Sequence, residues 1–176
     1  MNVLLAGGGG LIGTALADHL RAGGGRVTRL RRGRGDGPAR HDEVSWDPIR
    51  GTVDVERLDE AGPFAGVVNL AGAGIGDRRW SPSRKELIIE SRIGSTQLLV
   101  GTLAQLSTRP AVLVSASAVG FYGDRGDEVL TEGSPAGTGF LADLCQAWEK
   151  ATGPAGPAGT RTVLLRSGIV LARAGG

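Results

Sequence analysis

Three glycines near the amino end of the chain, Gly7, Gly10 and Gly13, have the spacing G-x-x-G-x-x-G. Glycine tolerates the backbone angles of a tight turn, and its missing Cβ lets phosphate groups approach the main chain. Amide groups at the start of a following helix then face the anion. This loop, with Leu11 and Ile12 between its last glycines, predicts a binding site for the pyrophosphate of a dinucleotide. The alternatives are a purely structural turn and a P-loop, and the P-loop is disfavoured because no Gly-Lys-Ser/Thr follows.

Arginines follow the glycine loop. Seven lie between positions 21 and 40 against one acid, Asp36, although the net charge of the chain is only +2. NAD-specific sites usually place an acid near the end of the second strand, whereas Arg31 and Arg32 stand there in this sequence. Guanidinium groups bind a ribose 2′-phosphate well, so we expect NADP(H) in preference to NAD(H). Nucleic-acid binding is the weaker alternative, because only 4% of residues are aromatic.

The elements that would position these residues alternate between strands and helices. Apolar runs predict strands at 2–6, 26–30, 43–46, 66–71, 111–116 and 162–166, and helical spacing predicts helices at 11–22, 82–105 and 140–152. Ser81 is a candidate N-cap before Pro82. Strand–helix–strand units form right-handed crossovers, so the sequence predicts one α/β domain over 1–176, with a doubly wound parallel sheet covered by helices on both faces.

Composition excludes several other classes of protein. The 31 glycines show no three-residue period, which excludes collagen. The single cysteine, Cys145, cannot form an internal disulfide, and one Cys with two His argues against a metal site. There is no long apolar run for a membrane span, and the first ten residues lack the basic region of a signal peptide. We therefore expect a cytoplasmic protein with no membrane or nucleic-acid partner.

Several motifs occur together along the whole chain. They are the glycine loop, Ser45-Trp46-Asp47-Pro48, NLAGAGI at 69–75, Ser115-Ala116-Ser117 with Phe121-Tyr122-Gly123, FLADLCQAWE at 140–149 and RSGIVL at 166–171. Together they resemble the extended short-chain dehydrogenases/reductases, in particular the nucleoside-diphosphate-sugar-epimerase-like family with a C-terminal domain of uncharacterised function. The resemblance implies a three-layer α/β/α Rossmann fold, NADP(H), an unidentified small-molecule substrate and a homodimer. It also implies that a C-terminal substrate-binding part lies beyond this chain.

The resemblance assigns further residues to the cofactor site. Asn69, Ala71 and Gly72 end a strand at the carboxyl edge of the sheet, where doubly wound folds bind ligands; the alternative is an Asn turn at a strand end. Ser115 joins this set. Asp47 stands where related enzymes place an acid near the adenine, unless it only starts a turn before Pro48.

Arg92 stands where relatives present an Asn toward the active site. It would contact the cofactor or an acidic substrate, or else form a surface salt bridge with Glu86 or Glu90.

The catalytic residues depart from the pattern of the resemblance. Active relatives use a Ser with Tyr-x-x-x-Lys on one helix, where the Tyr exchanges a proton with the substrate and the Lys lowers its pKa. Ser117 fits the Ser, but Phe140 and Leu144 stand where the Tyr and Lys would be. Tyr122, the only tyrosine, is the remaining candidate, unless it simply packs in a loop.

Three interpretations of these departures stay open. The protein is an NADP(H)-dependent oxidoreductase or epimerase-like enzyme with a rearranged acid/base, or it transfers only hydride and takes its proton from water. The third is a catalytically weak NADP(H)-binding regulatory or scaffold module.

Overall fold

The apolar run after Met1 forms strand β1 (Asn2–Ala6), which is buried along its whole length at the centre of the sheet. The structure, a computed structural model, describes residues 1–33, 41–76 and 78–173. The other elements are α1 (Leu11–Ala22), β2 (Arg26–Arg32), β3 (Glu43–Asp47), β4 (Thr52–Val53), α2 (Val55–Ala61), β5 (Gly66–Asn69), α3 (Pro82–Leu103), β6 (Val112–Ala118), α4 (Phe140–Lys150) and β7 (Arg161–Ser167), with 3₁₀ turns η1 (Val119–Tyr122) and η2 (Gly153–Ala155).

The described strands form one sheet in the order β4-β3-β2-β1-β5-β6-β7. All neighbours are parallel except β3 and β4, which are antiparallel. The chain builds the sheet outward from β1 in both directions, so the strand order reverses there. Ala6 at the end of β1 lies opposite Asn69 at the end of β5. The loops that follow these two strands therefore meet at the switch point where such sheets bind ligands.

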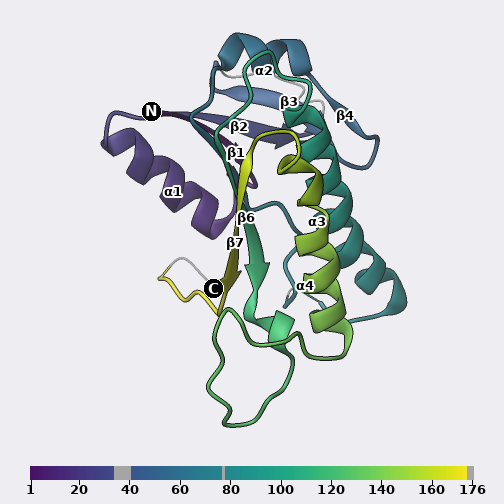
Figure 1. Ribbon diagram of the computed structural model, residues 1–176. Coiled ribbons are helices and arrows are strands. Elements are labelled where there is room, and N and C mark those ends of the chain that lie inside the picture. Colours follow the sequence, from purple (N-terminus) through teal and green to yellow (C-terminus); the bar gives the residue numbers. More distant parts are fainter. Residues whose placement is uncertain (34–40, 77, 174–176) are drawn as a thin grey trace.

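Helices lie on both faces of the sheet. Figure 1 shows α1 on one side and the long α3 beside α4 on the other. Because neighbouring residues of a strand point to opposite faces, Leu4 and Leu5 of β1 belong to different cores. Leu5 packs with Ala17 and Val27 beneath α1, and Leu4 packs in the larger core with Leu99 of α3. The predicted doubly wound α/β fold is confirmed.

The start of α3 follows the sequence closely. Ser81 accepts a hydrogen bond from the backbone amide of Arg84 at 3.2 Å through its side-chain oxygen, and Pro82 occupies the first turn. This pair satisfies an amide that the helix itself cannot bond, and Pro82 has no amide to satisfy. The predicted N-cap is therefore confirmed, whereas the helix ends two residues earlier than expected, at Leu103.

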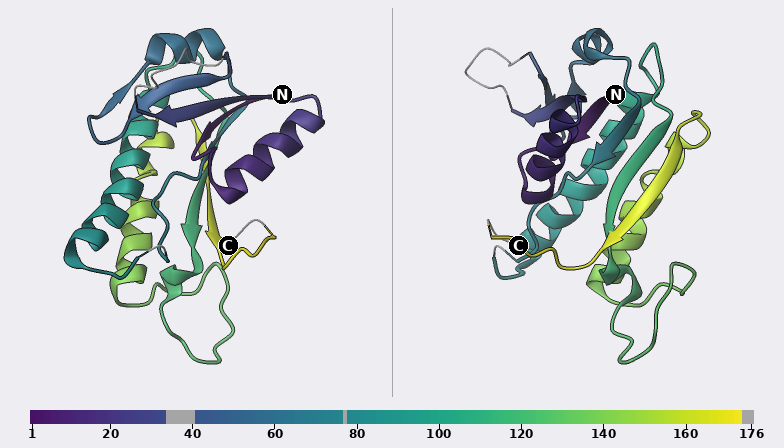
Figure 2. Two further views of the ribbon diagram at one scale, coloured as in Figure 1. Left: turned by 180° about the vertical axis from the view of Figure 1, so that it is seen from behind. Right: turned by 90° about the vertical axis from the view of Figure 1, so that its left-hand side faces the viewer.

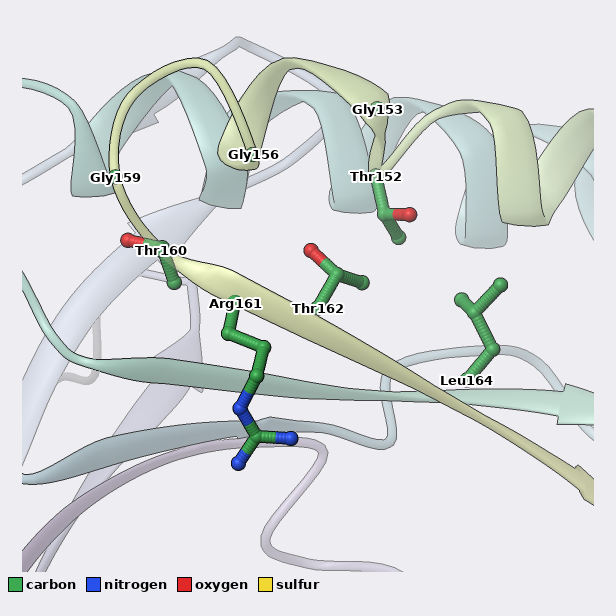
Figure 3. Close-up of a pocket in the computed structure, with 8 residues that line it drawn as sticks. All are labelled: Thr152, Gly153, Gly156, Gly159, Thr160, Arg161, Thr162 and Leu164. Atoms are coloured by element: carbon green, nitrogen blue, oxygen red, sulfur yellow. The ribbon is translucent and has the colours of Figure 1, made fainter.

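The structure differs from the sequence prediction in two respects. The short elements β4 and α2 were not expected, because two and seven residues are too few to show a period. Coverage of both faces is incomplete: beside α1, no helix of the described residues covers β6 and β7 (Figure 2, right). Leu165 of β7, which points to the opposite face from Leu164, is accordingly 43% exposed, and Leu164, on the α4 side of this edge strand (Figure 3), is 37% exposed.

Candidate functional site

The loop after β1 has a shape that only glycine allows. Gly7 has φ +80°, and a Cβ there would lie 2.5 Å from the carbonyl carbon and oxygen of Leu70 and 2.8 Å from the amide of Ala71. The Gly7 carbonyl accepts a hydrogen bond from the Gly10 amide at 3.2 Å, which closes the turn. The loop is thus pressed against the backbone that follows β5.

The last glycine of the triad joins the loop to α1. A Cβ on Gly13 would overlap the carbonyl oxygen of Gly7 and lie 2.8 Å from the Cα of Gly8. Gly10 is the N-cap and provides no side chain, and the first turn of α1 contains no acid. Leu11 is half-buried and Ile12 is 43% exposed. Within the described residues, the positive end of α1 is therefore left to an anion from outside the protein.

Arginines of β2 approach this loop. The Cγ and Cδ atoms of Arg29 lie 3.1 and 3.2 Å from where a Cβ of Gly8 would stand, and its Nε is buried without a hydrogen-bond partner among the described residues. Arg31 forms a 3.5 Å ion pair with Glu43 and stays 44% exposed, and Arg32 is exposed. Two more arginines of the basic segment, at 34 and 40, lie outside the described residues.

The end of β5 is held by a buried amide. Asn69 has no exposed surface; its Nδ2 donates to Thr96 at 2.9 Å and to Ser115 at 3.2 Å, and its Oδ1 accepts from the amide of Ala71 at 3.2 Å. Asn69 and Ser115 thus lie under the surface and fix the turn to Gly72, which is exposed. Direct contact of these residues with a cofactor stays a prediction.

Asp47 closes a turn at the end of β3. Its Oδ1 accepts from the amides of Ile49 and Arg50 at 3.0 and 3.1 Å, and its Oδ2 lies 3.7 Å from the guanidinium of Arg50. The turn that the sequence offered as an alternative is therefore formed. Contact with an adenine ring is a separate expectation that stays a prediction.

Arg92 is buried and not on the surface. It is 7% exposed and lies between the turn at Gly72 and helix α4, with its Cζ 5.1 Å from the ring centroid of Trp148. A Cβ at Gly72 would stand 3.2 Å from that Cζ, so the glycine makes room for the guanidinium. The surface salt bridge with Glu86 or Glu90 is wrong, because the side chain packs inward over Trp148.

The two candidate catalytic residues join one network. Glu149 accepts from Ser117 at 2.6 Å and from Nε and Nη2 of Arg166 at 2.8 and 2.9 Å. Arg166 also donates to the Tyr122 hydroxyl at 2.9 Å and stacks 3.5 Å above the Phe121 ring. The Ser117 hydroxyl therefore donates its hydrogen bond to Glu149. The Tyr122 oxygen accepts a hydrogen bond from Arg166, and its own O–H can still donate one.

Tyr122 reaches an open groove. The groove has a volume of about 560 Å³ and is lined by Tyr122, Leu130, Thr131, Glu132, Leu164, Leu165, Arg166 and Ser167. A second hollow of about 420 Å³ lies under the turn that joins α4 to β7 (Figure 3). Its lining, which includes Thr152, Gly156 and Thr162, contains no residue that the sequence assigned to the site. Of these two hollows, only the groove is lined by a candidate catalytic residue, Tyr122.

Phe140 and Leu144 stand at the two helix positions where the family resemblance led us to expect Tyr and Lys. Phe140 opens α4 and packs edge-on against Trp80 with 5.4 Å between ring centroids. Leu144 is buried in the body of the protein. Lys85, far away in sequence, places its Nζ 4.9 Å from the Phe140 ring centroid. Both positions on α4 are therefore apolar in the folded protein, and neither side chain can exchange a proton.

Cys145 and the acids provide no second chemistry. Cys145 is 3% exposed, and burial raises the pKa of its thiol, which agrees with a small buried hydrophobe. Within the described part of the chain, no group of three His, Cys, Asp or Glu residues could hold a metal. No helix of that part combines the length and apolar character needed to cross a bilayer.

Sequence reasoning missed three charged residues near the site. Glu149 and Arg166 contributed only to the motifs at 140–149 and 166–171, and Arg29 was noted only as part of a basic run. A signal was present: Glu149 and Arg166 are charges set in apolar stretches, and the two-residue period of β2 places Arg29 on the same face as Arg31.

The Glu149 network predicts a pH-dependent stability. Burial by itself raises the pKa of Glu149, but hydrogen bonds from Arg166 and Ser117 and the charge of Arg166 leave it below its ordinary value. The unfolded chain therefore takes up the proton first as pH falls. We expect Glu149→Gln to lower the free energy of unfolding by about 1–3 kcal/mol at pH 7. This difference should stay constant above about pH 5 and shrink below about pH 4.3.

Urea unfolding of both proteins between pH 3 and 8 measures this difference. Glu128→Gln is the matched control, because the Arg125–Glu128 pair is more exposed and such pairs contribute about 0–1 kcal/mol. A difference between wild type and Glu149→Gln that is the same at pH 7 and pH 3 would contradict the role of the carboxylate.

Comparison with known proteins agrees with this geometry. The model of the NAD dependent epimerase/dehydratase family matches residues 3–139. An epimerase family protein of Mycobacterium bovis is 45% identical over 174 residues, covering 99% of this chain and 55% of that protein. The human epimerase family protein SDR39U1 is 36% identical over 179 residues, covering 100% of this chain and 57% of that protein. The chain thus spans about half the length of these relatives.

Solved structures show the same fold. A nucleoside-diphosphate sugar epimerase from Corynebacterium glutamicum superposes with a TM-score of 0.82 at 40% identity, covering 100% of this chain and 35% of that one. Human SDR39U1 (isoform 2), solved with NADPH, gives a TM-score of 0.81 at 33% identity, covering 100% and 56%. The sheet order, the glycine loop and these matches lead to one assignment: the chain belongs to the NAD dependent epimerase/dehydratase family, with the Rossmann fold of the extended short-chain dehydrogenases/reductases.

Proposed function

We propose that this chain is the NADP(H)-binding part of an epimerase-like oxidoreductase of the extended short-chain dehydrogenase type. The observation that carries the proposal is the glycine loop: a Cβ at Gly7 or Gly13 would collide with neighbouring backbone, so the loop forms its tight turn only with glycine, beside a helix N-terminus without a capping side chain. A pyrophosphate fits this arrangement because it needs close backbone approach and several free amides. Amides at the start of α1 would bind the phosphates, and the bound nicotinamide would supply or accept a hydride.

Three arginines support NADP(H) over NAD(H). Arg29 lies against the loop with an unpartnered buried Nε, and Arg31 and Arg32 end the second strand, where a ribose would lie. A 2′-phosphate would gain charge-assisted hydrogen bonds from the exposed guanidinium groups of Arg31 and Arg32, and a bare 2′-hydroxyl carries no charge for them to neutralise. The NADPH in the human relative's structure agrees with this preference.

Tyr122 is the residue we propose as the proton donor. It lines the groove, its oxygen accepts from Arg166, and its own O–H remains to donate. Arg166 places a guanidinium 2.9 Å from the phenol oxygen, where it fixes the orientation of the hydroxyl. Ser117 and Glu149 hold Arg166 in place and are positioning residues. The alternative is a catalytically weak NADP(H)-binding module, which Phe140 and Leu144 favour because they place apolar groups where relatives have the acid.

Substitution of Gly13 tests the cofactor loop. Gly13→Ala should weaken NADPH binding at least tenfold, because the new Cβ would displace the Gly7 carbonyl. Gly101→Ala is the matched control: it is also a helical Gly→Ala change, but a Cβ there meets open space. It should leave affinity unchanged and stabilise the protein by up to about 1 kcal/mol. Calorimetric titration with NADPH measures the affinity of each variant, and thermal unfolding measures its stability. Equal affinities for the two variants would refute the loop assignment.

The arginines predict the cofactor preference. The double variant Arg31→Ala, Arg32→Ala should reduce the ratio of NADPH to NADH affinity by at least tenfold, because the 2′-phosphate loses charged donors while NADH loses none. Fluorescence titration with both nucleotides measures the ratio. Arg161→Ala, at an exposed position on β7, is the control. A ratio unchanged in the double variant would show that these arginines do not read the 2′-phosphate.

Turnover separates the enzyme from the module. NADPH oxidation is followed with a panel of carbonyl compounds and quinones, and Tyr122→Phe should slow it by about 10²–10⁴-fold with little change in NADPH affinity, as expected for loss of a general acid. A protein that binds NADPH but oxidises it with no member of the panel would support the binding module instead. Turnover that survives in Tyr122→Phe would point to water as the proton source.

A further inference from the structure

Arg92 is the buried cation that the proposed cofactor loop does not explain. It lies in the middle of α3 with 7% of its surface exposed, and its guanidinium rests on Trp148 and against the backbone at Gly72. Its Nη1 donates to the carbonyl of Ile88, one turn earlier in its own helix, at 3.2 Å. This single bond uses one of the five N–H groups that an arginine carries.

No acid among the described residues pairs with Arg92. Glu149, the acid of the adjoining network, bonds to Arg166 and Ser117 instead. Among the described residues, the other Arg92 nitrogens make no hydrogen bond, and they are not completely enclosed by protein atoms. These nitrogens therefore keep a small contact with solvent, although the residue as a whole is buried.

Such an arrangement costs the folded protein free energy. Burial lowers the pKa of Arg92; Cys145 raises it, and the like charge of Arg84 lowers it further. A buried charge is ordinarily paired or hydrogen-bonded, because desolvation is not otherwise offset. A lysine or methionine would fill this space without five fixed donors. The side chain thus matches an oxyanion that arrives with a ligand.

Arg92 contacts a different part of the turn after β5 than the glycine loop does. The glycine loop touches Leu70 and Ala71, whereas Arg92 lies beyond them at Gly72 and beside α4. Cys145 interacts both with Arg92 and with Ser117, so the guanidinium is close to the end of β6 that carries the Ser117–Glu149 network. Arg92 thus lies between the turn after β5 and the Ser117–Glu149 network.

We propose that Arg92 binds the carboxylate or phosphate of an anionic substrate, next to the bound nucleotide. The inference rests on the proposed function, because it assumes that the nucleotide occupies the glycine loop. A planar guanidinium offers two parallel donors to either oxyanion, which is the reason for Arg at this position.

The test uses the chain saturated with NADPH and two probes, malonate and inorganic phosphate, titrated at constant ionic strength. At least one probe should bind the wild type saturably in calorimetry and raise its unfolding temperature. Arg92→Met keeps the apolar stem and should weaken this binding at least tenfold, and Arg92→Lys should lie between the two. Arg161→Met, which removes an exposed arginine, should bind like the wild type.

Two further readouts separate a ligand-binding role from a structural one. Without ligand, Arg92→Met should unfold at a temperature no lower than the wild type, because it removes a buried charge that lacks an acid partner. Its NADPH affinity should stay within about twofold of the wild type. If Arg92→Met does not fold by circular dichroism, Arg92→Lys decides the anion comparison.

Several results would overturn the proposal. They are unchanged anion binding in the Arg92 variants, no saturable binding of either probe to the wild type, or a tenfold loss of NADPH affinity in Arg92→Met, which would assign Arg92 to the cofactor phosphates. Failure of the wild type to bind NADPH is a different result, because it would refute the proposed function itself.

Discussion

The close packing of Gly7 on the backbone of Leu70 and Ala71 is the contact on which the candidate site depends. Strands β1 and β5 are parallel neighbours, so the loops that leave their carboxyl ends compete for the same space. The loop after β1 fits because Gly7 has no side chain, and the turn after β5 is held in place by buried hydrogen bonds. Asn69 does the fixing, because its amide bonds to Thr96, Ser115 and its own strand end. The loop after β1, the turn after β5 and helix α3 therefore meet at this contact.

Two guanidinium groups near this point show how differently the same side chain is used. Arg166 has its donors matched by Glu149 and Tyr122, and these hydrogen bonds raise its pKa. Arg92 is more deeply buried, has no acid partner among the described residues, and has a lowered pKa. The first arrangement stabilises the junction of β6, β7 and α4. The second leaves charge and directional donors next to the end of β5, and this difference is the basis of the anion-binding role proposed for Arg92.

The structure also shows the surroundings of Phe140 and Leu144, where a Tyr-x-x-x-Lys pair was expected. Phe140 is held in an aromatic contact with Trp80, with Lys85 over its ring, so an apolar cluster occupies the start of α4. Tyr122 and Arg166 instead place a phenol beside a cation on η1 and β7. The two groups that relatives present from one helix are thus available here from two other elements, and this supports Tyr122 as the acid in the proposed enzyme.

The sequence by itself determined the alternating α/β fold, the glycine loop and the N-cap at Ser81, because these depend on local patterns of apolar residues, glycine and capping groups. It also pointed to Ser117, Tyr122 and Arg92. The tertiary structure alone decided what these residues contact. Glu149 is 32 residues from Ser117, and Arg166 is 44 from Tyr122, so no local pattern predicts either hydrogen bond. Nor could helical spacing show that Arg92 is buried over Trp148, because that ring belongs to a different helix, α4, far along the chain. Burial and pairing of charges arise only when distant elements pack together.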